Sequence, residues 1–256
     1  MKIKYYIITG LLALIFFLIL NIPAAPVIDR IKDKIPQLAI QNVSGTLWSG
    51  SAQQISVQAK HIFKDVSWSI CISHLIFAEL SVELEAIYNQ NPLSGRLIVD
   101  FDKNIQAENI KTTMDAKALG QMITLPMGEV AGNISIDLDT LSWQQGGTPS
   151  ASGVIKWDNA SITIAETAQL GDVTINLSEA ENKPVNAKIS NQGGHISIDG
   201  LASIGDTSDY ELDLSFTPSK NASNNLKDSL RLFAKPQSNG SFILKNSGNL
   251  KQLGLM

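Results

Sequence analysis

The feature that most constrains this chain is an uncharged stretch near its start, residues 5–22, with the sequence YYIITGLLALIFFLILNI. Lys2 and Lys4 precede it. A helix over these 18 residues would be about 27 Å long, close to the thickness of the hydrocarbon core of a bilayer. We therefore predict a transmembrane helix at residues 5–22, with residues 1–4 in the cytoplasm, because basic residues favour that side.

Two other interpretations of this stretch are open. Its apolar core, residues 7–20, is 14 residues long, which lies within the range of cleaved signal peptides. The small residues that cleavage requires are poorly placed, however, because Pro23 stands near the outer small position and Pro26 follows Ala25. A helix buried in a soluble domain would carry a polar stripe, and this stretch has none. Both points favour an uncleaved anchor.

Composition limits what the rest of the chain can do. About 234 residues follow the stretch, enough for one large domain or two small ones. They hold 18 basic residues against 24 acidic ones, a net charge of −6, which argues against nucleic acid as a partner. Cys71 is the single cysteine, so no internal disulfide can form. We expect Cys71 to be a small buried apolar residue.

Residues 23–36 carry the pattern of a short amphipathic helix next to the membrane. Val27, Ile28 and Ile31 fall at helical spacing among charged residues, and Pro36 would end the helix near Ile35. Such a helix could lie on the membrane surface or pack against the domain that follows. Its mixed charges favour packing on the domain.

From residue 37 onward the dominant pattern is alternation of apolar and polar residues, as in residues 80–86, 134–138 and 210–216. Turn-forming Gly and Asn separate the alternating runs, and this pattern is typical of antiparallel strands. We predict a mainly β fold, in which an N-terminal transmembrane helix is followed by an elongated, curved, meander-like antiparallel sheet with a few short helices. One domain would span residues 37–256.

Three interruptions of the alternation are expected. Residues 110–123 predict a short helix. Residues 224–234 predict a second helix, because Leu226, Leu230 and Phe233 share one face, with Asn224 or Asn225 as its cap and Pro236 beyond its end. Residues 71–78 form an apolar patch between strands, and a last short strand is expected at residues 241–245.

No pattern of catalytic or metal-binding residues is evident, so we expect no enzyme activity, cofactor, metal or small-molecule substrate. The three histidines are far apart in sequence and lack zinc-site spacing: His61, His74 and His195. Two pairs of carboxylates lie at spacing i, i+2 in expected strands: Glu83 with Glu85, and Asp137 with Asp139. Residues at this spacing point the same way, opposite the apolar set, and therefore indicate a solvated face.

The four tryptophans each lie in or beside an expected strand: Trp48, Trp68, Trp143 and Trp157. Packing in the core or at the ends of the sheet is the simpler interpretation. A protein-binding surface is the alternative, because Trp is enriched at interfaces.

The most specific stretch of the chain is Val43, Ser44, Gly45, Thr46, Leu47, Trp48, Ser49 and Gly50. Together with Trp68 in the run VSWSI, it resembles the N-terminal signature of the type II secretion system protein N family. We call these residues the signature. The resemblance implies a single-pass inner-membrane protein with most of the chain in the periplasm, an accessory subunit of the machinery that exports folded proteins across the outer membrane. It implies no catalytic residues. The implied partners are other secretion subunits, on the inner-membrane platform or the secretin side, and inner-membrane lipid.

Two modes of action remain open at this point. A sheet with exposed edges or Trp-rich ends could contact other periplasmic proteins, in part by strand addition. The strand pattern also resembles that of AsmA-type envelope proteins, which implies by analogy an apolar β-groove that binds or guides lipid.

Overall fold

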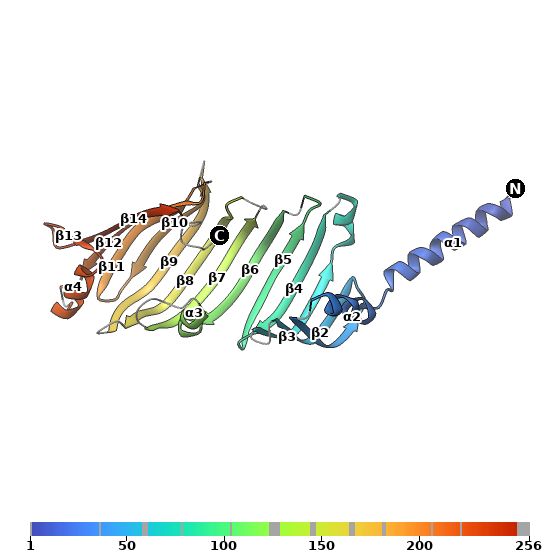
Figure 1. Cartoon of the computed structure of the whole chain (residues 1–256), viewed down its shortest axis with the longest axis horizontal. Helices are drawn as coiled ribbons and strands as arrows, with labels where there is room; N and C mark the ends of the chain where they lie inside the picture. Colours follow the sequence, from blue (N-terminus) through green and yellow to red (C-terminus); the bar gives the residue numbers. More distant parts are fainter. Residues whose placement is uncertain are drawn as a thin grey trace. The chain divides into compact units, whose positions relative to one another are not determined.

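The computed structural model of the protein describes residues 2–35, 37–57, 61–77, 79–102, 104–122, 129–143, 147–163, 167–180, 183–205, 207–220 and 222–249. The chain divides into two compact units, Met1–Phe101 (unit 1) and Asp102–Met256 (unit 2). Each unit contains an antiparallel sheet with short helices (Figure 1).

The first helix, α1, spans Lys2–Leu20 and covers most of the uncharged stretch. Its large apolar side chains are exposed on every side of the helix, from 44% for Ile15 to 74% for Tyr6. Asn21 donates a side-chain hydrogen bond of 2.8 Å to the carbonyl of Phe17, in the last turn. Among the residues that the structure describes, no helix combines the length and the apolar character needed to cross a membrane.

The second helix, α2, spans Ala24–Lys34 and follows directly. It begins after Pro23 and lies against the first strand of unit 1. Ala24 is completely buried. The helix ends where the Ile35 N–H donates to the carbonyls of Ile31 and Lys32, both at 3.1 Å. Of the residues predicted to form this helix, Ala24–Lys34 are helical, and of the two predicted locations the structure has the helix packed on the sheet.

The sheet of unit 1 is a meander in which each strand pairs with the next one along the chain. Its strands are β1 (Leu38–Gly45), β2 (Ser49–Val57), β3 (His61–Ile70), β4 (Leu80–Tyr88) and β5 (Asn91–Val99). The apolar patch expected between strands is a 3₁₀ helix, η1 (Ile72–Phe77), in the connection from β3 to β4.

The prediction that Cys71 is buried is wrong. Cys71 is exposed. It follows the last residue of β3, where its N–H donates to the carbonyl of Ser81 at 2.9 Å. Its Sγ lies 3.3 Å from the hydroxyl of Ser73. Because the side chain projects from a connection and not from a strand, the sheet does not cover it.

The sheet of unit 2 is a longer antiparallel meander. Its strands are β6 (Ile105–Asp115), β7 (Glu129–Trp143), β8 (Ser150–Thr163), β9 (Thr167–Ala180), β10 (Lys183–Gln192), β11 (Ile196–Ile204), β12 (Asp209–Pro218), β13 (Lys235–Pro236) and β14 (Phe242–Asn249). Sequential neighbours pair from β6 to β12, and β14 then lies between β12 and β13. The predicted mainly β, antiparallel, meander-like fold is therefore confirmed.

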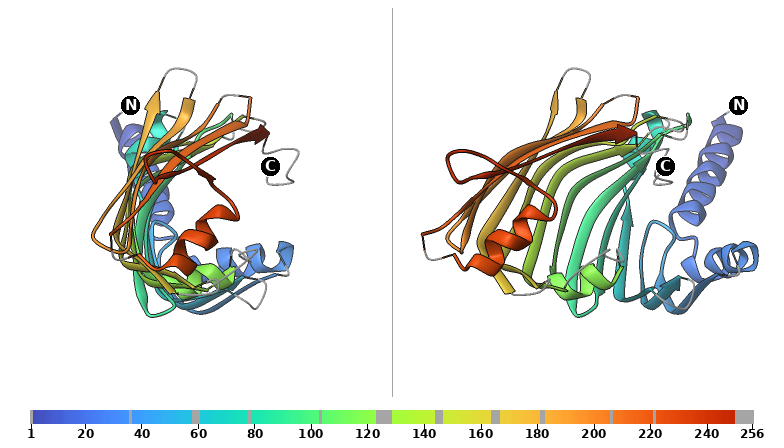
Figure 2. Two further views of the ribbon diagram at one scale, coloured as in Figure 1. Left: turned by 90° about the vertical axis from the view of Figure 1, so that its left-hand side faces the viewer. Right: turned by 60° about the vertical axis from the view of Figure 1, so that its left-hand side comes forward.

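The cross-strand register of unit 2 gathers apolar side chains on one face. Ile136 pairs with Ile155, and Ile155 pairs on its other side with Ile175. Ile175 pairs in turn with Ile189. Residues directly opposite one another share a face, so this row defines what we call the inner face. The strands bend along their length, and the concave side of this sheet carries helix α4 (Figure 2).

The opposite, outer face is polar. Lys111 lies 3.6 Å from Asp137 on the neighbouring strand, and Lys245 donates a 2.6 Å hydrogen bond to Asp213. Asp137 and Asp139 are both exposed. The prediction of a solvated face at this pair of carboxylates is confirmed.

The core of unit 2 forms where α4 (Asn224–Arg231) covers the inner face. Leu226 and Leu230 are 5% and 2% exposed. They belong to one cluster with residues of the sheet that include Leu170, Ile196 and Ile198. The helix begins at Ser223, whose hydroxyl accepts a 3.0 Å hydrogen bond from the Leu226 N–H. The expected caps, Asn224 and Asn225, instead lie inside the helix, which ends at Arg231 and not at residue 234 as predicted.

Two other predicted boundaries need correction. The helix expected at residues 110–123 is shorter, because residues 110–115 belong to β6 and only Ala116–Met122 forms helix α3. Asp115 accepts a 2.7 Å hydrogen bond from the Lys117 N–H, which satisfies one amide at the start of α3. The last strand, expected at residues 241–245, extends to Asn249 as β14.

Replacement of Leu230 by Ala should lower the free energy of unfolding by about 2–5 kcal/mol, because it opens a cavity where α4 meets the sheet. Urea denaturation followed by circular dichroism measures the loss. Leu232→Ala is the matched control: Leu232 follows α4 directly and is 78% exposed, so its loss should stay within about 0.5 kcal/mol. Equal losses in the two variants would contradict the described packing of α4.

Candidate functional site

The signature residues lie together in unit 1. Val43, Ser44 and Gly45 end β1, whereas Gly50 lies at the start of β2. Thr46, Leu47 and Trp48 form the turn between these strands, and Trp68 is in β3. Two sequence segments about twenty residues apart therefore meet at one end of the sheet.

The backbone of this turn is held by short-range hydrogen bonds. The Thr46 N–H donates to the carbonyl of Ser49 at 2.8 Å, and the Ser49 N–H donates to the Thr46 hydroxyl at 3.1 Å. Gly45 has a φ of +83°, in the left-handed region that glycine adopts readily and other residues disfavour. Gly45 and Thr46 thus both stabilise the conformation of the turn.

Gly50 and Trp68 explain why the two segments of the signature occur together. They are direct cross-strand partners. A Cβ atom on Gly50 would collide with the ring of Trp68 and would lie 2.7 Å from the carbonyl oxygen of Ser44. The Trp68 indole N–H donates to the carbonyl of Leu47 at 3.1 Å. The absence of a side chain at position 50 therefore lets the Trp68 ring lie over the strand and bind the turn.

Trp48 and Leu47 connect the turn to the end of α1. The Trp48 indole N–H donates to the carbonyl of Ile19 at 2.8 Å. The Leu47 N–H donates to the carbonyl of Ile22, also at 2.8 Å. An antiparallel bridge pairs Pro23 with Thr46. We call this set of contacts the joint.

The other two tryptophans, Trp143 and Trp157, differ in their exposure and hydrogen bonding. Trp157 lies in β8, and its indole N–H donates to the carbonyl of Ala131 at 3.0 Å. Trp143, at the end of β7, is 55% exposed. Trp68 and Trp157 lie within strands and bond to the backbone of unit 1 and unit 2, respectively. Trp48 lies in a turn and bonds to the end of α1, whereas Trp143 presents its ring to solvent.

The unit 1 histidines, His61 and His74, and the pair Glu83 and Glu85 are not among the residues of the joint. His61 is within 3.0 Å of the Tyr88 hydroxyl, and His74 is within 3.3 Å of Glu79. Glu83 accepts a 2.6 Å hydrogen bond from Arg96 across the strands. In the part of the chain that the structure describes, no group of three His, Cys, Asp or Glu side chains could hold a metal ion.

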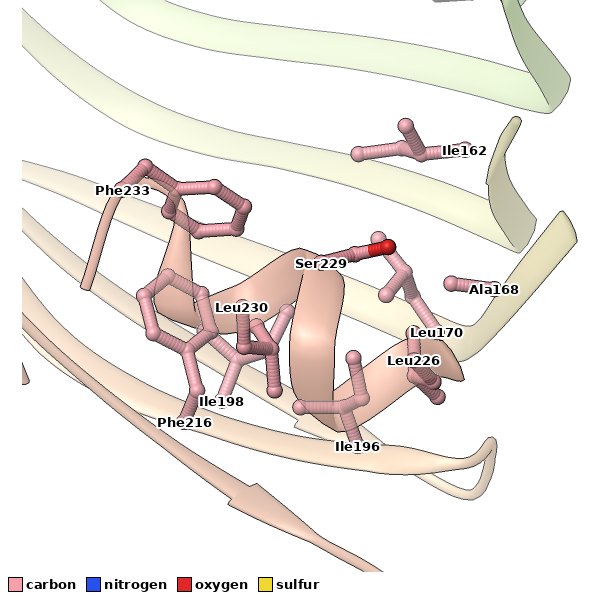
Figure 3. A pocket seen from close by; sticks show the side chains of 10 residues that line it. All are labelled: Ile162, Ala168, Leu170, Ile196, Ile198, Phe216, Leu226, Ser229, Leu230 and Phe233. Atoms are coloured by element: carbon pink, nitrogen blue, oxygen red, sulfur yellow. The ribbon is translucent and has the colours of Figure 1, made fainter. Parts of the chain in front are cut away.

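A small cavity lies between α4 and the inner face of unit 2 (Figure 3). Its volume is ≈ 100 Å³. Nine of the ten residues that line it are apolar, and Ser229 is the polar one; the apolar set is Ile162, Ala168, Leu170, Ile196, Ile198, Phe216, Leu226, Leu230 and Phe233. Such a lining can hold an apolar group but offers no acid or base. The helical spacing of Leu226, Leu230 and Phe233 predicted the covering helix, not the space beneath it.

A second hollow in unit 2 is polar. It is lined by Gln106, Thr140, Ser142, Ser152 and Glu179, and its volume is ≈ 480 Å³. The hydroxyls of Thr140 and Ser152 lie 2.7 Å apart, and Glu179 accepts a 2.9 Å hydrogen bond from Ser150. No histidine or cysteine is among its lining residues, so the hydroxyls have no imidazole beside them to act as a base.

Comparisons with known proteins give a consistent result. A family model described as type II secretion system (T2SS), protein N matches residues 36–245. The type II secretion system protein N of Pectobacterium carotovorum subsp. carotovorum is 22% identical, over 98% of this chain and 100% of that protein. The protein of the same name from Vibrio cholerae serotype O1 is 21% identical, over 83% of this chain and 85% of that protein. No solved structure matches. The family match includes the whole signature and ends within β14.

Proposed function

Because this chain belongs to the type II secretion system protein N family, we propose that it is a bitopic inner-membrane accessory subunit of that system. It acts by protein–protein contact, without catalysis, in the export of folded proteins across the outer membrane. The observation that carries this proposal is the family match, which spans both units and the signature.

The proposed topology places α1 in the inner membrane, residues 1–4 in the cytoplasm and the two units in the periplasm. The apolar side chains that α1 exposes on every side support it, since such a surface is unfavourable in water. Lys2 and Lys4 supply the basic flank that stays in the cytoplasm. A single cysteine means that folding in the oxidising periplasm requires no disulfide.

The proposed mode of contact is strand addition at the free side of β14. Among the described strands, β13 pairs with β14 only at Phe242 and Ile243. Residues Leu244–Gly248 have β12 on one side and no described strand on the other. Such an edge offers backbone N–H and C=O groups to an extended segment of another protein. The partners proposed are subunits of the inner-membrane platform or of the secretin side.

The contact can be tested with a photo-crosslinking amino acid at Asn246, on β14, in cells that are secreting. We expect covalent adducts with another secretion subunit. Asp199, exposed on the outer face of β11 between two paired strands, is the matched control and should give none. Adducts at neither position, or equal adducts at both, would contradict strand addition at this edge.

The topology can be tested with reporters fused after residue 256. Alkaline phosphatase, which is active only in the periplasm, should be active, whereas green fluorescent protein exported through the same route should be dark. The same fusions to a chain that lacks residues 1–22 should show the reverse pattern. A fluorescent fusion of the full chain would overturn the proposed topology.

Lipid binding is a second candidate function, and the apolar cavity beneath α4 is the observation that favours it. An acyl chain is narrow enough to enter a space between a helix and a sheet. If lipid binds there, native mass spectrometry of the full chain should detect phospholipid adducts, and Ala168→Leu, which fills part of the cavity, should remove them. Leu201→Gln, on the exposed outer face, should leave them unchanged. A wild-type protein without adducts would exclude this candidate.

A further inference from the structure

The joint brings together two segments of unit 1 that are separated along the chain by α2 and β1. After α1 the chain forms α2 and β1 and then returns, so that residues 46–48 lie beside residues 19–23. The covalent connection between α1 and the sheet runs through all of α2. The contacts of the joint are a second connection, made through space.

The bond to Ile19 has a clear physical basis. The last four carbonyls of a helix lack an amide partner within the helix. The carbonyl of Ile19 is one of these; the Ile22 N–H reaches it at 3.3 Å and the Trp48 indole at 2.8 Å. The indole N–H is the one hydrogen-bond donor of a Trp side chain, and Trp48 uses this donor to bind α1.

Ile70 and two signature residues, Gly50 and Trp68, hold the turn with Trp48 in place. The Trp48 carbonyl accepts a 2.6 Å hydrogen bond from the Ile70 N–H. Trp68 binds the carbonyl of Leu47, and the missing side chain of Gly50 makes room for the Trp68 ring. Residues of β2 and β3 thus fix the turn that contacts α1.

We infer that the signature is an intramolecular docking site for the end of α1, in which Trp48 is the positioning residue. The sheet of unit 1 is fastened to α1 by this site and does not depend on the chain through α2 to stay attached. The inference concerns contacts within the protein, so it stands or falls independently of the proposed role in secretion.

The inference can be tested by cleaving the chain between α2 and β1 and measuring whether the two fragments stay bound to each other. A site for a sequence-specific protease is inserted after Ile35 in the full chain, and the protein, purified in detergent through a C-terminal tag, is cleaved. The helical fragment with α1 and α2 should remain bound to the tagged body. Trp48→Phe, which keeps a ring but removes the indole N–H, should release this fragment about five-fold faster, a factor in the range of one hydrogen bond.

Two further variants sharpen the result. Trp143→Phe is the matched control, because Trp143 is an exposed tryptophan of unit 2; this variant should release the fragment at the wild-type rate. Gly50→Ala should also speed release, because its new methyl group displaces Trp68 from the turn. The contribution of α2, which lies against β1, is common to all the variants.

A stability measurement separates docking from a general effect on the fold. The urea midpoint of the tagged body alone, after the helical fragment has been removed, should be the same for wild type and Trp48→Phe. Unchanged release in Trp48→Phe would overturn the inference. A lower midpoint of the body with a matching change in release would overturn it as well, since Trp48 would then serve the sheet and not the attachment of α1.

Discussion

The constraint on which the structure of unit 2 depends is that its sheet is a single layer with one apolar face. In unit 2 the row of Ile136, Ile155, Ile175 and Ile189 lies on one side, and ion pairs such as Lys111 with Asp137 lie on the other. An apolar face has to be covered by another element. Unit 2 meets this need with α4, and its best-buried cluster lies under that helix. The position of the core and of the apolar cavity both follow from this constraint.

Much of the fold could be predicted because alternation is a local signal. A strand with one polar and one apolar face is visible in residues 134–138 without knowledge of its neighbours. Local signals failed where two of them competed. The charges Lys111 and Asp115 lie at helical spacing and run into the Ala-containing segment that follows, yet residues 110–115 alternate in burial as part of β6. Ser223 and Asn224 are both good helix caps, and geometry decided between them.

The sequence singled out the signature residues, and the structure brings them together through contacts that the sequence does not predict. The family match confirms the resemblance that the signature suggested. The pairing of Gly50 with Trp68 depends on the register of β2 and β3, and the bond from Trp48 to Ile19 joins residues 29 positions apart. Neither is encoded in spacing along the chain. The same limit applies to Cys71, whose exposure depends on where β3 ends.

The position of β14 has a consequence for how unit 2 assembles. From β6 to β12 each strand can pair as soon as its successor is available, so these pairings need little loop closure. Strand β14 pairs back to β12 across the segment that contains α4 and β13. The ends of that segment are therefore brought together last. If the polypeptide crosses a membrane with its N-terminus first, the apolar inner face of this sheet stays uncovered until roughly the last forty residues, which include α4, have emerged.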